Sequence, residues 1–178
     1  MLTESRLKNN IFLIGFMGCG KSTVANYLKE NYGLCRVEMD DKIVEEVGMT
    51  IPDIFKLRGE EFFRDAESEL LGRIIMLSNM VASCGGGTPL RQKNVDMMRS
   101  CGKIVFLTAR PETILERVKD NHDRPLLENN KTVEYIEELL NKRKDIYTAA
   151  ADIIIETDGK SVEDICKEII EKTGLSLS

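Results

Sequence analysis

The sequence has no long apolar run. A membrane-spanning helix needs roughly 20 consecutive apolar residues, and each apolar run in this 178-residue sequence is much shorter. The opening segment, MLTESRLKNN, also lacks the apolar run of a signal peptide. We therefore expect a cytoplasmic protein that has no membrane partner.

Paired cysteine motifs and an excess of basic residues are also missing. The five cysteines are odd in number and scattered, and none form a C-x-x-C pair, so neither a disulfide framework nor a zinc site is expected. Lys and Arg number 25 against 30 for Asp and Glu, which gives a net charge of −5 and argues against a nucleic-acid partner. The single histidine, His122, lies in a polar segment and receives no catalytic role. A small metabolite is the more plausible substrate.

Short apolar runs alternate with segments of helical periodicity along the chain. Strands are expected over 11–15, 34–39, 80–84, 104–107 and 152–156. Helices are expected over 21–32, 41–46, 52–56, 60–77, 111–119, 132–147 and 162–172, with a polar loop over 120–131. Because the strand candidates are apolar on both faces, the pattern predicts an α/β fold in which a parallel sheet lies between two helix layers. One domain over 1–178 is expected.

The strongest motif is a phosphate loop. Residues 15–22, GFMGCGKS, fit G-x-x-x-x-G-K-[ST] and lie between a predicted strand and a predicted helix, as this motif requires. Its backbone N–H groups would face the phosphates of a nucleotide, Lys21 would place a positive charge on the transferred phosphate, and Ser22 would offer a hydroxyl to Mg²⁺. The predicted nucleotide-binding residues of this segment are Gly18, Cys19, Gly20, Lys21, Ser22 and Thr23. Cys19 would contribute its backbone N–H, and we expect its thiol to be open to reagents.

The phosphate loop alone indicates only that a nucleoside triphosphate binds. A GTPase switch should also carry an N-K-x-D segment, and residues 141–144, NKRK, fail at the fourth position. The acceptor side of the site must therefore decide the function.

Further elements follow the phosphate loop in a distinctive order: Glu38-Met39-Asp40, GEEFFR over 59–64, a triple glycine over 85–87, RPL over 124–126, and Arg143-x-x-x-Tyr147. At these separations the chain resembles the shikimate kinase family, which phosphorylates the 3-hydroxyl of shikimate from ATP. The resemblance covers nearly the whole chain. It implies a P-loop kinase of the nucleoside-monophosphate-kinase type with a five-stranded parallel sheet, a mobile substrate-binding insertion over about 39–68, and a mobile lid over about 117–131.

The resemblance also implies roles for individual residues. Asp40 matches the carboxylate that holds the acceptor hydroxyl and is proposed as its base. Arg64 and Arg143 match the clamp on the substrate carboxylate, while Gly86 and Gly87 match backbone donors to substrate hydroxyls. On the nucleotide side, Arg124 matches the lid arginine that closes on the phosphates, Arg117 the arginine that stacks on adenine, and Lys160 a basic residue beyond the adenine. Residues matching the apolar walls of the acceptor pocket are Ile51, Phe55, Phe63, Pro125 and Leu126.

These assignments are also chemically coherent. Shikimate is a small anion with three hydroxyls, so two guanidinium groups and one carboxylate suit its recognition. Phosphoryl transfer needs charge neutralisation more than covalent help, so Lys21, Arg124 and Mg²⁺ would supply most of the catalysis.

One departure from the family lies at the expected metal site. Where the family has D-x-D, this chain has Glu38-Met39-Asp40, so the carboxylate assigned with Ser22 to the Mg²⁺ shell is one methylene longer. Asp41 could substitute for it, although alternation along a strand end would point Asp41 away.

Two other functions compete with an ATP-dependent shikimate kinase. A gluconate or nucleotide kinase on the same scaffold would differ in its acceptor pocket. A non-catalytic nucleotide-binding regulator is conceivable because of Glu38, but the intact Lys21, Asp40, Arg64, Arg124 and Arg143 argue against it. We expect a monomer whose partners are shikimate, ATP and Mg²⁺.

Overall fold

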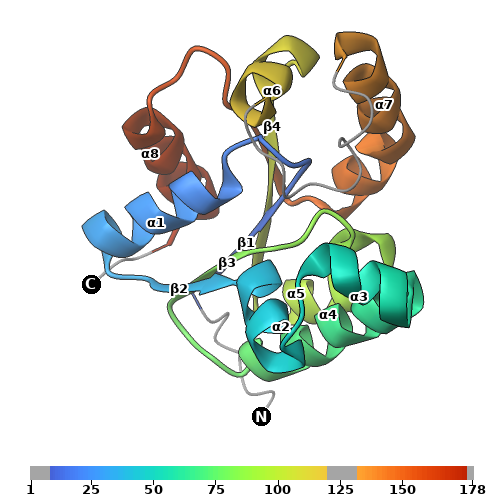
Figure 1. Cartoon of the computed structure of the whole chain (residues 1–178). Coiled ribbons are helices and arrows are strands. Elements are labelled where there is room, and N and C mark those ends of the chain that lie inside the picture. The colour runs from blue at the N-terminus through green and yellow to red at the C-terminus, as the bar shows by residue number, and fades with distance from the viewer. Residues whose placement is uncertain (1–8, 120–131, 176–178) are drawn as a thin grey trace.

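The computed structural model describes residues 9–119 and 132–175, and a five-stranded parallel sheet forms its centre (Figure 1). The strand order is β2-β3-β1-β4-β5. The strand bounds are β1 Asn10–Ile14, β2 Cys35–Glu38, β3 Met80–Ser83, β4 Gly102–Thr108 and β5 Ile153–Glu156. Strand β1 lies at the centre of the sheet, with Phe12 opposite Ala82 of β3 and Ile104 of β4. The predicted α/β class and parallel sheet are confirmed.

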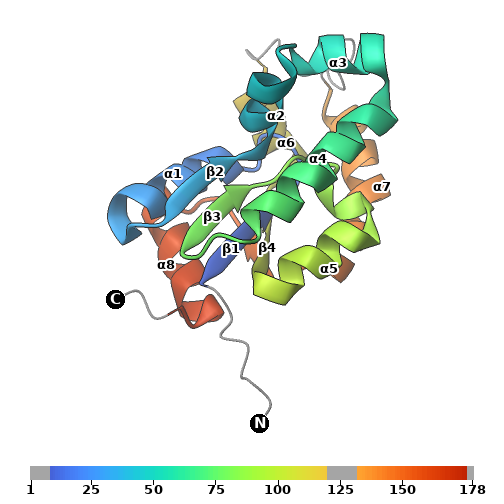
Figure 2. The same ribbon diagram turned by 90° about the horizontal axis from the view of Figure 1, so that it is seen from below.

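Helices cover both faces of the sheet (Figures 1 and 2). Helices α1 and α8 pack together on one face. Helices α4 and α5 lie on the other, with α2 and α3 attached to α4 and with α6 packed on α7. The helix bounds are α1 Lys21–Tyr32, α2 Met39–Val47, α3 Ile51–Arg58, α4 Glu60–Ile74, α5 Gln92–Cys101, α6 Pro111–Val118, α7 Val133–Ala150 and α8 Val162–Thr173.

The core follows from the alternation of side chains along β1. Ile11 and Leu13 enter the cluster beneath α1 and α8, whereas Phe12 and Ile14 enter the cluster beneath α4 and α5. All four side chains are fully buried, and each contributes about 1.5–3 kcal/mol of apolar burial. A strand that is buried on both faces must read as an unbroken apolar run, which is why IFLI indicated a parallel sheet.

The structure adds a helix that the sequence did not predict. Helix α5 is mostly polar, and it buries Val95, Met98 and Cys101, which follow one another at spacings of three. A short 3₁₀ turn, η1 (Thr88–Leu90), leads into it. The apolar residues of α5 do recur at helical spacing, but they are few in a mostly polar segment, and the sequence analysis overlooked the helix.

Several helix ends also differ from the prediction: α4 ends at Ile74 rather than at 77, and α3 runs from Ile51 to Arg58 rather than over 52–56. Helix α2 begins at Met39 rather than near Asp41, which places two acidic residues in its first turn, where they complement the helix dipole. Helix α7 continues to Ala150, and Arg99 donates hydrogen bonds to the carbonyls of Ala149 and Ala150. This tertiary cap satisfies carbonyls that the helix itself leaves unpaired. The predicted loop over 120–131 lies outside the described residues. Across 9–119 and 132–175, none of the helices combine the length and apolar character of a membrane span.

Candidate active site

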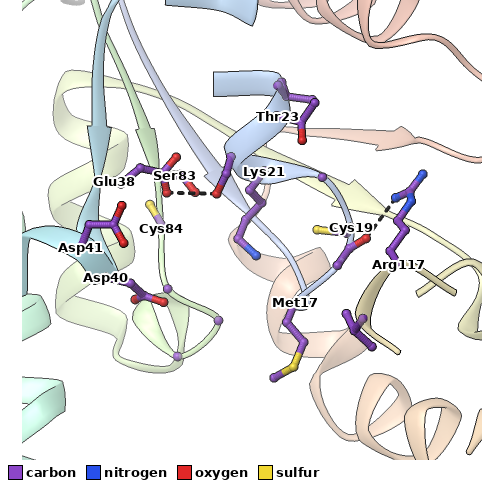
Figure 3. A pocket seen from close by; sticks show the side chains of 18 of the residues that line it. Met17, Cys19, Lys21, Thr23, Glu38, Asp40, Asp41, Ser83, Cys84 and Arg117 are labelled. Atoms are coloured by element: carbon purple, nitrogen blue, oxygen red, sulfur yellow. Dashed lines mark hydrogen bonds between the residues drawn. The ribbon is translucent and has the colours of Figure 1, made fainter. Parts of the chain in front are cut away.

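A cavity of about 930 Å³ opens at the carboxyl ends of the strands (Figure 3). In open α/β sheets ligands bind at this edge, because the loops that follow the strands converge there. The cavity is lined by every predicted site residue that the structure describes: Gly18, Cys19, Gly20, Lys21, Ser22, Thr23, Glu38, Asp40, Arg64, Gly86, Gly87, Arg117, Arg143 and Lys160. Arg124 lies outside the described residues.

The phosphate loop joins β1 to α1 and surrounds one end of the cavity. Gly15 has φ +141°, and a Cβ there would come within 2.5 Å of the carbonyl oxygen of Leu107, so this position requires glycine. The Lys21 ammonium donates to the carbonyls of Gly15 and Phe16 at 2.8 and 3.1 Å. The first turn of α1 presents unpaired backbone N–H groups and the positive end of the helix dipole, which together favour an anion.

The side chain of Cys19 differs from expectation. It is 1% exposed and packs in the core cluster beneath α1, so the expectation of an accessible thiol is wrong. The Cys19 backbone N–H donates to the carbonyl of Phe16 at 3.3 Å. The loop curls tightly enough to turn this small side chain inward.

Ser22 and Glu38 meet across the cavity between α1 and the end of β2. The Ser22 hydroxyl donates to Oε2 of Glu38 at 3.1 Å. Hydroxyl and carboxylate oxygens are ligands that suit Mg²⁺. Within the described ranges no group of three or more His, Cys, Asp and Glu side chains could hold a metal by itself. This donor set therefore fits a Mg²⁺ ion that takes its other ligands from phosphate and water, as Mg²⁺ commonly does.

Asp40 and Asp41 follow Glu38 in the first turn of α2, and both line the cavity. Figure 3 shows them on the side of the cavity opposite Arg117, with Asp40 nearer the glycine turn. The expectation that strand alternation turns Asp41 away is wrong, because the chain is already helical at this point. Glu38, Asp40 and Asp41 thus form an acidic edge that faces Lys21.

Arg64, which the sequence analysis predicted to bind the acceptor, lies in the second turn of α4 and lines the cavity. Its guanidinium donates to Glu67 at 2.7 Å and to Glu60 at 3.0 and 3.2 Å, and its side chain is 11% exposed. Burial alone would lower the pKa of Arg64, but the carboxylates of Glu67 and Glu60 raise it above its ordinary value. Gly87 packs directly against this guanidinium. Arg64 is therefore a fixed cation at the cavity wall.

Glu67, which the sequence analysis missed, does not line the cavity but holds Arg64 in place from behind. Its side chain is fully buried, and Oε2 accepts from Arg64 while Oε1 accepts from the Thr88 hydroxyl at 2.9 Å. Burial raises the pKa of Glu67, against the opposing effects of Arg64 and Thr88. The available signal was an acidic residue three positions after Arg64, on the helix face that also buries Leu70 and Leu71.

Arg143 approaches the glycine turn from α7. Its Nη1 donates to the Tyr147 hydroxyl at 3.4 Å, and that hydroxyl donates to the carbonyl of Gly86 at 2.7 Å. Tyr147 is 1% exposed, and burial raises the pKa of its hydroxyl, so the donating proton stays in place. The R-x-x-x-Y spacing places both groups one helical turn apart on the face that meets the turn over 85–87.

Helix α6 and the loop after β5 line the cavity beyond the phosphate loop. Arg117 donates to the carbonyl of Gly18 at 3.0 Å, and Figure 3 shows its guanidinium beyond the phosphate loop. Lys160 forms an ion pair with Glu168 at 2.6 Å. Of the predicted apolar wall, Ile51, Phe55 and Phe63 line the cavity, whereas Pro125 and Leu126 lie outside the described residues.

The arrangement has two chemically distinct halves. One half offers backbone N–H groups and Lys21 to phosphates, with Ser22 and Glu38 suited to a divalent cation. The other half offers Arg64 and Arg143 on two helices, on either side of a glycine turn that Asp40 also faces. This combination suits the transfer of a phosphoryl group to a small anion that carries a hydroxyl.

Comparisons with known proteins agree with this geometry. The family model described as shikimate kinase matches residues 17–173. A curated shikimate kinase of Persephonella marina is 44% identical over 161 residues, which cover 90% of this chain and 96% of that protein. A solved shikimate kinase of Acinetobacter baumannii in complex with shikimate superposes with a TM-score of 0.86 at 32% identity, covering 92% of both chains. A gluconokinase of Sinorhizobium meliloti shares the fold alone, with a TM-score of 0.60 and 18% identity over 95% of this chain and 93% of that one.

Proposed function

The chain belongs to the shikimate kinase family, and we propose that its cavity divides the transfer of a phosphoryl group from ATP to the 3-hydroxyl of shikimate between the two halves described above. The chain acts as a shikimate kinase and forms shikimate 3-phosphate and ADP. The observation that carries the acceptor assignment is the approach of Arg64 and Arg143 to the same glycine turn beside Asp40.

In the nucleotide half, the phosphate loop holds the β- and γ-phosphates of ATP through its backbone N–H groups. Lys21 leaves the carbonyls of its own loop and neutralises charge on the transferred phosphoryl group. Arg117 stacks on the adenine, and Lys160 lies on its far side. Arg124 is proposed to close over the phosphates as part of a lid over about 117–131, which keeps water from the reacting group.

In the acceptor half, Arg64 and Arg143 bind the carboxylate of shikimate, and the backbone of Gly86 and Gly87 orients its hydroxyls. A guanidinium that is fixed before binding loses little entropy when it pairs with a carboxylate. Asp40 accepts a hydrogen bond from the 3-hydroxyl and takes up its proton as the oxygen attacks phosphorus. The segment over about 39–68 carries Asp40 and Arg64 and forms the substrate-binding insertion.

Ser22 and Glu38 would hold Mg²⁺ together with phosphate oxygens. When bound, the ion would supply positive charge that neutralises the phosphates. The contact between the Ser22 hydroxyl and Glu38 Oε2 already brings the two protein ligands together. We also propose that the chain works as a monomer in the cytoplasm.

Release of ADP, measured with a panel of acceptors, tests the choice of substrate. Shikimate, gluconate and nucleoside monophosphates are each supplied with saturating ATP and Mg²⁺, and a reaction without acceptor measures hydrolysis. Turnover should depend on shikimate and give shikimate 3-phosphate. Turnover with gluconate or a nucleotide but not with shikimate would transfer the assignment to that acceptor class, and the absence of turnover with every acceptor would favour a binding protein without catalysis.

The two carboxylates can be distinguished by their dependence on Mg²⁺. Asp40→Asn keeps the shape of the side chain but removes its basicity, so turnover should fall by about 10²–10⁴ with an unchanged Mg²⁺ requirement. Glu38→Gln should raise the Mg²⁺ concentration for half-maximal turnover, whereas Glu38→Asp restores the shorter side chain of the family and should remain active. A shifted Mg²⁺ requirement in Asp40→Asn, with none in Glu38→Gln, would mean that the two roles are exchanged.

A further inference from the structure

Arg36 makes a contact with Glu38 that no role described above explains. Residues two apart on a strand share a face, so Arg36 and Glu38 project from the same side of β2. The Arg36 Nε and Nη2 groups donate to Oε1 of Glu38 at 3.1 and 2.9 Å. The other oxygen of that carboxylate, Oε2, accepts from the Ser22 hydroxyl. The Glu38 carboxylate is therefore held from two sides. Arg36 and Glu38 both line the cavity.

The length of Glu38 explains why such a contact matters. A glutamate has one more rotatable bond than the aspartate it replaces, so an unrestrained carboxylate would sample several positions. Arginine presents its donors in a planar, preformed fork and restrains its partner better than lysine does. The side chains of Arg36 and Glu38 are 30% and 15% exposed, so water only partly weakens their ion pair.

The division of the two oxygens indicates what the contact achieves. Both donors of Arg36 go to Oε1, whereas Oε2 faces Ser22, the second expected ligand of the cation. A purely competing arginine would occupy the oxygen that the metal needs. Here the guanidinium instead occupies Oε1 and leaves Oε2 directed at the Ser22 hydroxyl, with which it would hold Mg²⁺.

We propose that Arg36 is a positioning residue that holds the longer Glu38 carboxylate so that Oε2 meets Mg²⁺ beside Ser22. This inference rests on the proposed role of Glu38. Partners of metal ligands generally influence affinity in this way, and their removal typically weakens metal binding by about 10–100-fold. Because Arg36 is partly exposed, we expect a loss of about tenfold, at the lower end of that range.

The test measures binding rather than turnover. The affinity for AMPPNP, a non-hydrolysable ATP analogue, is measured by calorimetry over a series of Mg²⁺ concentrations. The gain in AMPPNP affinity that Mg²⁺ causes is the Mg²⁺ coupling. Arg36→Met should raise the Mg²⁺ concentration that gives half of this gain by about tenfold. Arg36→Lys, which keeps the charge but loses the planar fork of donors, should raise it by less. Arg73→Met removes another arginine–glutamate pair, with Glu46, outside the cavity, and should leave the coupling unchanged.

A double-mutant cycle connects the effect to Glu38. In a Glu38→Gln background, Arg36→Met should cause little further loss of Mg²⁺ coupling, because the group that Arg36 positions is already altered. Full additivity of the two losses would overturn the proposal. So would a gain in Mg²⁺ coupling in Arg36→Met, since a competing arginine should release the metal site when it is removed.

A further arm excludes direct recognition of phosphate. With EDTA in place of Mg²⁺, AMPPNP should bind the Arg36→Met variant as it binds the unaltered chain, and a loss there would place Arg36 on the nucleotide itself. Thermal melts of Arg36→Met and Arg36→Lys show whether each variant is folded. None of these measurements contain shikimate. A failure of the acceptor panel would therefore not change the result for Arg36, and a failure of the Arg36 test would not change the choice of acceptor.

Discussion

Gly87→Ala should disable the acceptor half of the site although it replaces no charged residue. Gly87 has φ −94° and ψ −11°, a conformation that alanine adopts without strain. A Cβ at this position would, however, overlap the guanidinium of Arg64. That guanidinium is held by Glu67 and Glu60, so it can leave only by giving up these ion pairs. The substitution is therefore a test of whether Arg64 is as fixed as the structure indicates.

Two limits bracket the cost in stability. If Arg64 stays, the new methyl group overpacks the site, which typically costs about 1–3 kcal/mol. If Arg64 leaves, the buried Glu67 loses its cation, and breaking a buried pair costs about 3–5 kcal/mol. Glu67 keeps its hydrogen bond from Thr88 in that case, which reduces the second cost. Because the Cβ would overlap the guanidinium itself, Arg64 must move, and we expect a loss near the lower end of the second range, about 3 kcal/mol in the free energy of unfolding.

The effect on binding should be selective. A displaced Arg64 no longer pairs with the substrate carboxylate, and losing one partner of such a pair costs about 2–5 kcal/mol, so shikimate should bind roughly thirtyfold more weakly or worse. Affinity for ATP should barely change. Calorimetry with each ligand separately, together with urea denaturation, measures all three quantities.

Two other glycines supply controls. Gly72→Ala lies in the same helix as Arg64, meets nothing within 4 Å, and should raise stability by about 0.5–1 kcal/mol with unchanged binding. A Cβ on Gly86 would lie 3.1 Å from Nη1 of Arg143, a milder clash that should weaken shikimate binding less than Gly87→Ala does. In an Arg64→Ala background, Gly87→Ala should add little further loss. Wild-type shikimate affinity in Gly87→Ala, or equal losses for ATP and shikimate, would refute the reasoning.

Three further outcomes follow from the acceptor side. Arg143→Ala should weaken shikimate binding by about 2–5 kcal/mol and leave ATP affinity nearly unchanged, and calorimetry showing the reverse pattern would remove Arg143 from the acceptor site. Tyr147→Phe leaves the carbonyl of Gly86 without its 2.7 Å hydrogen bond, so urea denaturation should show a loss of about 0.5–1.5 kcal/mol, with a smaller loss pointing to replacement by water. Burial raises the pKa of Glu67 in the folded chain. Between the ordinary glutamate pKa and the raised one, the folded chain therefore keeps a proton that the unfolded chain releases. The contribution of Glu67 to the free energy of unfolding falls as pH rises through this range. Glu67→Gln should flatten that fall in a series of urea titrations across mildly acidic pH, and an unaltered slope would show that Glu67 does not titrate there.

The sequence by itself determined the parts of this protein that local chemistry dictates. The run IFLI between a polar leader and a glycine loop indicates a strand buried on both faces, and the phosphate loop that follows indicates that a nucleoside triphosphate binds. The bounds of α1, Lys21–Tyr32, match the prediction because the loop ends in Gly20 and a left-handed Gly33 ends the helix. The acceptor residues Asp40, Arg64 and Arg143 were found through a family resemblance, since each of them alone reads as an ordinary surface charge.

Tertiary structure decided what depends on residues that are distant in the chain. Helix α5 is stabilised by the sheet that covers its apolar residues, and Glu67 holds Arg64 from behind, where the glycine turn after β3 brings Thr88 against it. The role proposed for Arg36 depends on the packing of β2 against α1, which places Glu38 between Arg36 and Ser22. The burial of Cys19 was likewise set by how the phosphate loop folds onto the core beneath α1. Burial and long-range pairing are properties of the packed chain, and local sequence patterns do not contain them.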